Sequence, residues 1–132
     1  MRRRQRGFTL LELLTVMTIL ALLASVGIVG YRSHTKSAKE SVLKENLFQL
    51  NHCLEQYRAD RGRYPSSLSQ LRDLGYIRDI PADPMTNSKD MWQTELEPPD
   101  PENPDAELGI WKVRSSSQDI GSNGIPYNEW SY

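Results

Sequence analysis

The sequence contains few of the residues that build covalent or metal-held scaffolds. It has one cysteine, Cys53, and two histidines, His34 and His52, in 132 residues. A single cysteine excludes an intrachain disulfide and a cysteine metal cluster. Neither histidine has a partner at the spacing that metal binding or nucleophile activation requires, and a glycine-rich phosphate loop is missing. We therefore expect both histidines on the surface, Cys53 in a packing role, and a protein that is not an enzyme.

The sequence also lacks the excess of basic charge that nucleic-acid-binding domains usually show. Its net charge is −1, and four of its 16 basic residues stand at the amino terminus, namely Arg2, Arg3, Arg4 and Arg6. Without these four, 12 basic residues stand against 17 acidic ones, a net charge of −5. We therefore expect no nucleic-acid partner.

A long apolar run follows the arginines. Residues 8–31 read FTLLELLTVMTILALLASVGIVGY, and Glu12 is their only formally charged side chain. As a helix these 24 residues span about 36 Å, enough to cross a hydrocarbon core of about 30 Å. The arginines in front predict a cytoplasmic amino terminus and an extracytoplasmic remainder. The run therefore predicts a single-pass protein of the inner membrane.

Two interpretations of this run differ in where the chain is cut. An ordinary secretory signal is the alternative, because the small residues of the run resemble its cleavage site, namely Ala21, Ala24, Ser25 and Gly27. The length of the run and the charge of Glu12 near its start argue against it. A carboxylate within hydrocarbon costs about 2.5–3.5 kcal/mol on insertion scales and is by default a candidate functional residue.

The segment Gly7-Phe8-Thr9-Leu10-Leu11-Glu12 closely resembles the cleavage and methylation motif of type IV prepilins. That motif combines a glycine before the cut, an aromatic new amino terminus and a glutamate at the fifth mature position. The resemblance implies that a membrane aspartyl peptidase removes residues 1–7 as a basic leader and N-methylates Phe8. It also implies that Glu12 acts in filament assembly.

The predicted helix continues beyond the membrane. Residues 32–61 contain no helix breaker, and an apolar stripe recurs in them at spacings of four and three: Leu43, Leu47, Leu50, Leu54 and Tyr57. This pattern predicts an amphipathic half of one helix that runs from Phe8 to about Asp60. The stripe faces either a coiled-coil partner or the core of the domain that follows. Its short length favours the core.

Residues 62–132 predict a small domain that packs on this helix. Gly62 and Pro65 end the long helix, and 66–75 reads as a short helix that buries Leu68, Leu71 and Leu74. Residues 91–97 and 109–114 alternate as two antiparallel strands, separated by a proline-rich loop. We expect Trp92, Thr94 and Leu96 on one face of the first strand. In the second we expect Trp111 and Val113 on one face and Ile110, Lys112 and Arg114 on the other. The expected fold class is α+β, with the long amino-terminal helix packed on a small antiparallel sheet.

This second half resembles the major pseudopilin of type II secretion systems. The likeness lies in Gly62-Arg63-Tyr64-Pro65, Gly75-Tyr76-Ile77 and Ile80-Pro81-Ala82-Asp83-Pro84, although Met85-Thr86-Asn87 replaces the usual Trp-Gly-Asn. The family's proline late in the apolar run is also missing. The resemblance implies a pilin-like fold and a subunit that stacks by its amino-terminal helix. The implied partners are other copies and other pseudopilins, the prepilin peptidase, an inner-membrane assembly platform and membrane lipid.

The same resemblance raises the question of a metal ion in residues 115–124. Major pseudopilins hold calcium in a carboxy-terminal loop of this placement, through aspartates and backbone carbonyls. Calcium takes six to eight oxygens, several carboxylates among them, and Asp119 is the one carboxylate in this segment. Asn123-Gly124 is also explained as a plain turn. We keep Asp119 as the candidate metal ligand and expect no cofactor, with calcium binding weak or absent.

Taken together, these features predict a structural subunit of a membrane-anchored pseudopilus fibre that drives protein export. A type IV pilus subunit for adhesion, motility or DNA uptake is the alternative of the same class. Such pilins often carry a carboxy-terminal disulfide loop, which one cysteine cannot form. A membrane-anchored binding domain that never polymerises is the alternative of another class, but it would need neither Glu12 nor cleavage after Gly7.

Overall fold

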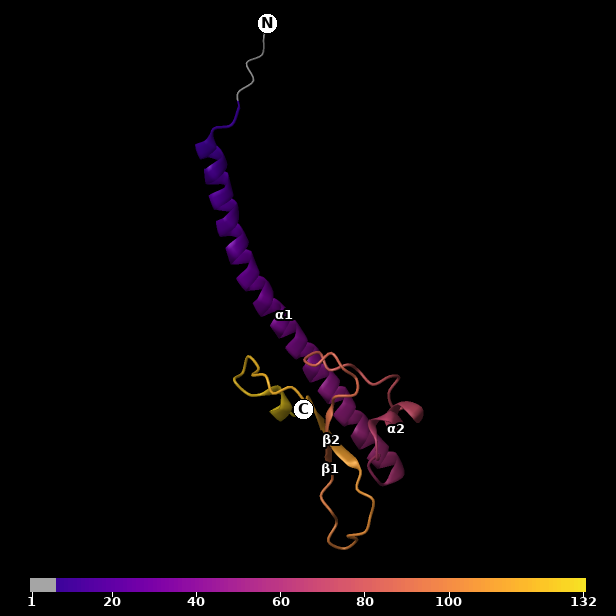
Figure 1. The fold of residues 1–132 in the computed structure, drawn as a ribbon. Coiled ribbons are helices and arrows are strands. Elements are labelled where there is room, and N and C mark those ends of the chain that lie inside the picture. The colour runs from indigo at the N-terminus through magenta and orange to yellow at the C-terminus, as the bar shows by residue number, and fades with distance from the viewer. Residues whose placement is uncertain (1–6) are drawn as a thin grey trace. The chain divides into compact units, whose positions relative to one another are not determined.

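The computed structural model describes residues 7–132 (Figure 1). The predicted leader arginines, Arg2, Arg3, Arg4 and Arg6, lie outside the described residues. The chain forms helix α1 (Leu10–Arg61), helix α2 (Leu68–Asp73), strands β1 (Gln93–Leu96) and β2 (Ile110–Arg114), and a short 3₁₀ helix, η1 (Tyr127–Glu129). One long helix and one two-stranded antiparallel sheet make up the predicted α+β class.

The chain divides into two compact units, Met1–Lys36 and Ser37–Tyr132. In the first unit the large apolar side chains of α1 are exposed from Leu10 to Ile28. Among the described residues, α1 is the one helix long and apolar enough to cross a membrane, with a window of mean hydropathy 2.4 and none of it buried. These side chains need lipid or other helices to cover them.

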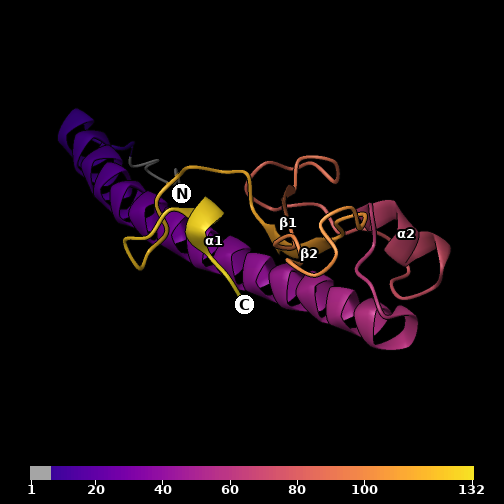
Figure 2. The same ribbon diagram turned by 90° about the horizontal axis from the view of Figure 1, so that it is seen from below.

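The core of the second unit lies on one face of α1. Leu43, Leu47, Leu50 and Leu54 are fully buried, and Tyr57 is almost so. The sheet, α2 and the carboxy-terminal segment gather along this half of α1 (Figure 2). These elements and the segments that connect them complete the core, together with Cys53 of α1: Tyr64, Leu71, Ile77, Ile80, Trp92, Ile110, Val113, Tyr127 and Trp130. The apolar stripe therefore faces the core of its own chain, as its short length predicts.

The two strands pair with an irregularity that changes which side chains are buried. Glu95 pairs with Lys112 and Leu96 with Ile110, so Trp111 is the extra residue of a bulge. Because the bulge interrupts the alternation, Ile110 joins Val113 in the core, and Trp111 is only partly buried. The predicted opposition of Ile110 and Val113 is therefore wrong.

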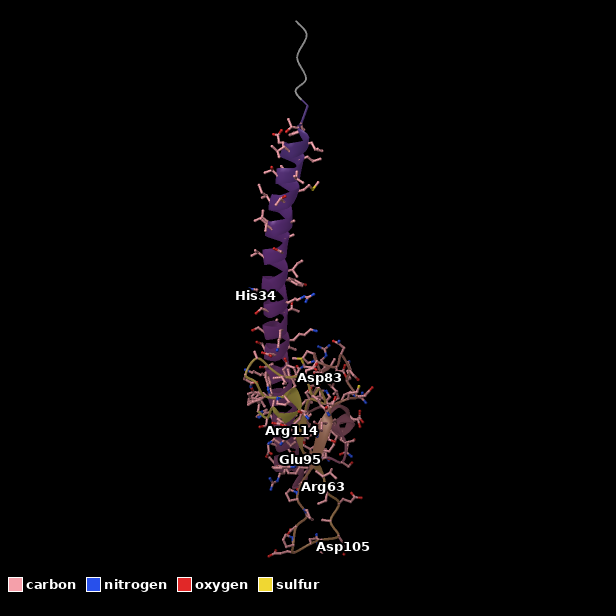
Figure 3. All side chains as sticks on the ribbon, turned by 60° about the vertical axis from the view of Figure 1, so that its left-hand side comes forward. His34, Arg63, Asp83, Glu95, Asp105 and Arg114 are labelled. Atoms are coloured by element: carbon pink, nitrogen blue, oxygen red, sulfur yellow. The ribbon has the colours of Figure 1, made fainter. Side chains whose placement is uncertain are left out.

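Strand β1 is exposed along its whole length. Trp92, just before it, is buried, whereas Thr94 and Leu96, predicted on the same face as Trp92, are exposed. The reason is that β2 is the strand bonded to α1, through Asn51 and the backbone of Val113, which leaves β1 at the outer edge. An ion pair of 3.3 Å between Arg114 and Glu95 ties the strands together (Figure 3).

Helix α2 is shorter than predicted, and this changes the position of one leucine. Leu71 is fully buried and Leu68 partly so, but Leu74 is 45% exposed, contrary to the prediction. The helix ends at Asp73, and Gly75 turns the chain with a φ of +81°. The amide of Tyr76 then bonds back to the carbonyl of Leu71 at 2.9 Å, a closing pattern that favours glycine at the turn.

Candidate functional site

The predicted cleavage motif lies directly before α1. Gly7, Phe8 and Thr9 precede the helix, which begins at Leu10. A side chain at Gly7 would find nothing within 4 Å, and Phe8 is 87% exposed. The peptide bond between Gly7 and Phe8 is therefore accessible within the described residues.

Thr9 determines where the helix starts. Its Oγ1 accepts a hydrogen bond from the amide of Glu12 at 3.2 Å, as an N-cap threonine does. Thr9 and Glu12 also have the three-residue spacing of a capping box. We did not predict this role, although the Thr-x-x-Glu pattern before an apolar run could have indicated it.

Glu12 lies in the first turn of α1, among exposed leucines such as Leu11 and Leu13. The helix start carries a partial positive charge, which favours a carboxylate there. Among residues 7–132, no ion pair joins the Glu12 carboxylate to another side chain. An exposed anion on an apolar surface is thus available to a group outside the chain.

Glu40 is a buried acid that sequence reasoning missed. The residue is 6% exposed, and its Oε1 accepts hydrogen bonds from the Ser122 amide and the Tyr127 hydroxyl, both at 2.8 Å. Its Oε2 accepts a third from the Ser122 hydroxyl. A signal was present, because Glu40 precedes Leu43 by three residues and so continues the buried stripe by one step.

The carboxy-terminal segment is held to α1 at two further points. Asn51 accepts a hydrogen bond from the Val113 amide at 2.9 Å and donates one to the Tyr132 carbonyl at 3.1 Å. The Lys44 ammonium lies 5.3 Å from the ring centroid of Trp130, within the range of a cation–π interaction. The loop that contains Asp119 is therefore fixed on both sides, and Asp119 itself is exposed.

The residues considered for catalysis are not brought together. His34 and His52 are exposed on α1, and His52 stacks on Phe48. Cys53 is buried, and its burial raises the pKa of the thiol, which disfavours the reactive thiolate. Its sulfur donates to the Tyr76 carbonyl at 3.4 Å, consistent with a packing role.

The contact between Tyr127 and Glu40 predicts a response to alkaline pH. Burial, and next the hydrogen bond to Glu40, raise the pKa of Tyr127 from 10.0 to about 12. A raised pKa in the folded state contributes stability below pH 10 that is lost as the pH rises through about 12. We expect the free energy of unfolding, from denaturant titrations, to fall more steeply over this window in the natural chain than in Tyr127→Phe.

Tyr132→Phe is the matched control, because Tyr132 is half exposed at the end of the same segment. It should keep the steep fall. If the free energy of unfolding fell equally steeply with pH in the natural chain and in Tyr127→Phe, the pH response would not come from Tyr127.

Known proteins resemble this chain along most of its length. Residues 2–28 match the family described as the prokaryotic N-terminal methylation motif. The type II secretion system core protein G of Dickeya chrysanthemi is 28% identical over 156 aligned positions, which cover 94% of this chain and 97% of that protein. No solved structure matches the chain.

Two further relatives carry the same name. The protein of Aeromonas hydrophila is 32% identical over 106 positions, covering 68% of this chain and 74% of that protein. The protein of Klebsiella pneumoniae is 31% identical over 97 positions, covering 61% and 69%. These similarities confirm the resemblance to the prepilin-type family and to the major pseudopilin. The chain belongs to the family of the type II secretion system core protein G.

Proposed function

We propose that this chain is a structural subunit of a pseudopilus fibre that drives protein export in a type II secretion system. The observation that carries the proposal is an amino-terminal methylation motif on an exposed apolar helix, in a chain related throughout to core protein G. The relatives are secretion proteins by name, which favours export over a type IV pilus used for adhesion, motility or DNA uptake.

The chain is anchored in a membrane by the apolar part of α1. The leader arginines support an orientation with the leader in the cytoplasm and the domain on the periplasmic side of the inner membrane. In this orientation the peptidase meets Gly7 at the cytoplasmic face. The domain, with its net negative charge, then lies in the periplasm.

Assembly exchanges lipid for other copies of the same helix. Leu10, Leu13, Leu14 and Met17 line a shallow apolar groove on α1, which suits the side chains of a neighbouring helix. Lipid tails are as apolar as leucine, so close packing and polar contacts must supply the preference for a neighbour. The exposed Glu12 is the polar group best placed to do so.

The subunit acts by position and catalyses no reaction itself. Its partners are other copies, other pseudopilins, the prepilin peptidase that cuts it and the platform protein that adds it to the fibre. The energy for assembly comes from a separate ATPase, because the sequence contains no phosphate-binding loop. As the fibre grows, the domains on its surface push or pull the exported protein.

Processing at Gly7 tests this proposal. Mass spectrometry of the mature chain should find a methylated Phe8 as its first residue. Gly7→Leu should leave the leader attached, because a side chain beside the cut blocks the peptidase. In a strain whose own gene is deleted, the natural gene should restore export of type II substrates and Gly7→Leu should not.

Gly27→Ala provides the matched control, since Gly27 lies in the same apolar segment with nothing within 4 Å of an added Cβ. It should be cut and should restore export. A mature chain beginning near Ser25 or Gly27 would instead establish ordinary signal cleavage. It would contradict the proposed assembly of this chain into a fibre.

A further inference from the structure

The family resemblance implies a calcium ion in the loop of residues 115–124, and the residues present do not fit one. Calcium requires six to eight oxygen ligands, and tight sites include several carboxylates. Asp119 is the one carboxylate of this loop. Within residues 7–132, no three side chains of histidine, cysteine, aspartate or glutamate gather where they could hold a metal ion.

Many of the other oxygens of the loop are already engaged within the protein, although the Ser116 hydroxyl is buried without a hydrogen-bond partner among the described residues. The Ser117 hydroxyl accepts a hydrogen bond from the Asp119 amide at 3.3 Å, and the Asn123 side chain accepts one from the Ile125 amide at 3.0 Å. Backbone carbonyls are engaged in the same way, at 2.9 to 3.0 Å, in Ser117, Asp119, Gly121 and Ile125. A cation would have to compete with these bonds for its ligands.

The loop is organised instead around an anion from α1. Glu40 lies 82 residues before Ser122 and 87 before Tyr127, and it accepts hydrogen bonds from both. Hydrogen bonds to an ionised acceptor are about twice as strong as those between neutral groups. Because the carboxylate is almost fully buried, losing a donor would leave it incompletely satisfied.

Packing fixes the same loop from its other side. A Cβ added at Gly121 would lie 2.5 Å from the indole of Trp130 and 2.9 Å from the side chain of Asn123. The Trp130 indole donates to the Ile125 carbonyl at 3.2 Å. The loop thus packs over the buried Trp130 and bonds to Glu40 on α1. These contacts hold its two ends together without a cation.

We propose that the Glu40 carboxylate takes the place of a calcium ion in ordering the carboxy-terminal loop. A calcium ion gathers oxygen acceptors around a positive charge. Glu40 does the converse, because a buried negative charge gathers an amide and two hydroxyl donors. The loop of this chain is accordingly ordered by a contact with its own helix and is independent of the calcium concentration.

The experiment uses the full chain in detergent micelles and needs no fibre. Hydrogen exchange of the loop amides and the thermal midpoint are measured with calcium chloride and with a chelator. Both should be the same in the two conditions. Glu40→Gln should accelerate exchange at the Ser122 backbone amide about tenfold or more. The glutamine side chain keeps the size of glutamate but lacks its negative charge.

Asp119→Asn is the matched control, and it should change neither the exchange nor the response to calcium. Ser122→Ala is a second, milder variant, which removes one donor and should accelerate exchange in the loop but leave the core protected. Calcium-dependent protection that Asp119→Asn abolishes would overturn the proposal. Unchanged exchange in both Glu40→Gln and Ser122→Ala would overturn it too.

Discussion

Replacing Glu12 with leucine is expected to abolish fibre formation while leaving membrane insertion and leader cleavage intact. The substitution makes α1 more apolar, so insertion becomes easier, by less than the about 2.5–3.5 kcal/mol that a charge costs at the centre of a membrane helix, because Glu12 lies in the first turn. The residues beside the cut, Gly7 and Phe8, are unchanged. The effect should therefore appear only when subunits meet.

The expected loss follows from a pairing that we propose between neighbouring subunits. In this proposal, leader removal exposes the amine of Phe8 as a positive charge at the start of an apolar helix. A neighbour displaced along the fibre can set its exposed Glu12 carboxylate beside that amine. Two opposite charges about 4 Å apart gain on the order of 4 kcal/mol at an effective dielectric near 20. Pairing also avoids the free-energy cost of leaving the amine and the carboxylate unpaired near hydrocarbon.

The measurement is the number and length of fibres in electron micrographs of cells that express the complete machine. Mass spectrometry of the same cells verifies that the leader has been removed. Thr15→Leu is the control, because it also makes α1 more apolar, and within residues 7–132 the Thr15 hydroxyl bonds to its own helix, at the Leu11 carbonyl. Normal fibres from Glu12→Leu would mean that the carboxylate merely reaches the lipid headgroups.

Leu50→Ala is expected to lower the free energy of unfolding by about 2–5 kcal/mol. Leu50 lies in the middle of the buried stripe of α1 and has no exposed surface. Truncating it loses the transfer free energy of the removed atoms and leaves a cavity in the core. For a domain of this size such a loss is a large part of the total stability.

Denaturant unfolding of the full chain in micelles measures this effect, with the fluorescence of the buried Trp92 and Trp130 as the signal. Val42→Ala is the control on the same helix, since Val42 is half exposed, and it should change the free energy by no more than about 0.5 kcal/mol. Equal stabilities for Leu50→Ala and the natural chain would place the stripe against a partner.

Features that depend on neighbours in sequence were predictable. The alternation of four and three from Leu43 to Tyr57 identifies the buried face of α1, because the period of a helix is a local property. Gly75 marks the end of α2 for a similar reason. The motif of Gly7, Phe8 and Glu12 is also a pattern of near neighbours, recognised by its resemblance to that of type IV prepilins.

Features that depend on distant segments were not predictable. Nothing near Trp111 signals the extra residue in β2, which arises from pairing with β1 and moves Ile110 into the core. Glu40 occupies a position of the buried stripe, but a polar residue there is explained only by Ser122 and Tyr127, far along the chain. Hydrophobic periodicity carries no information about such partners.

The distance in sequence between α1 and its partners also sets an order of events during export. The segment that satisfies Glu40 and Asn51 lies about 80 residues later in the chain, at Ser122 to Tyr132. In the proposed orientation the amino-terminal helix enters the membrane first, and the part of its buried face near Glu40 stays uncovered until this segment has crossed. Contacts of such long range form slowly, so the domain completes its core only at the end of translocation. A subunit that joined a fibre earlier would present an unfinished surface to its neighbours.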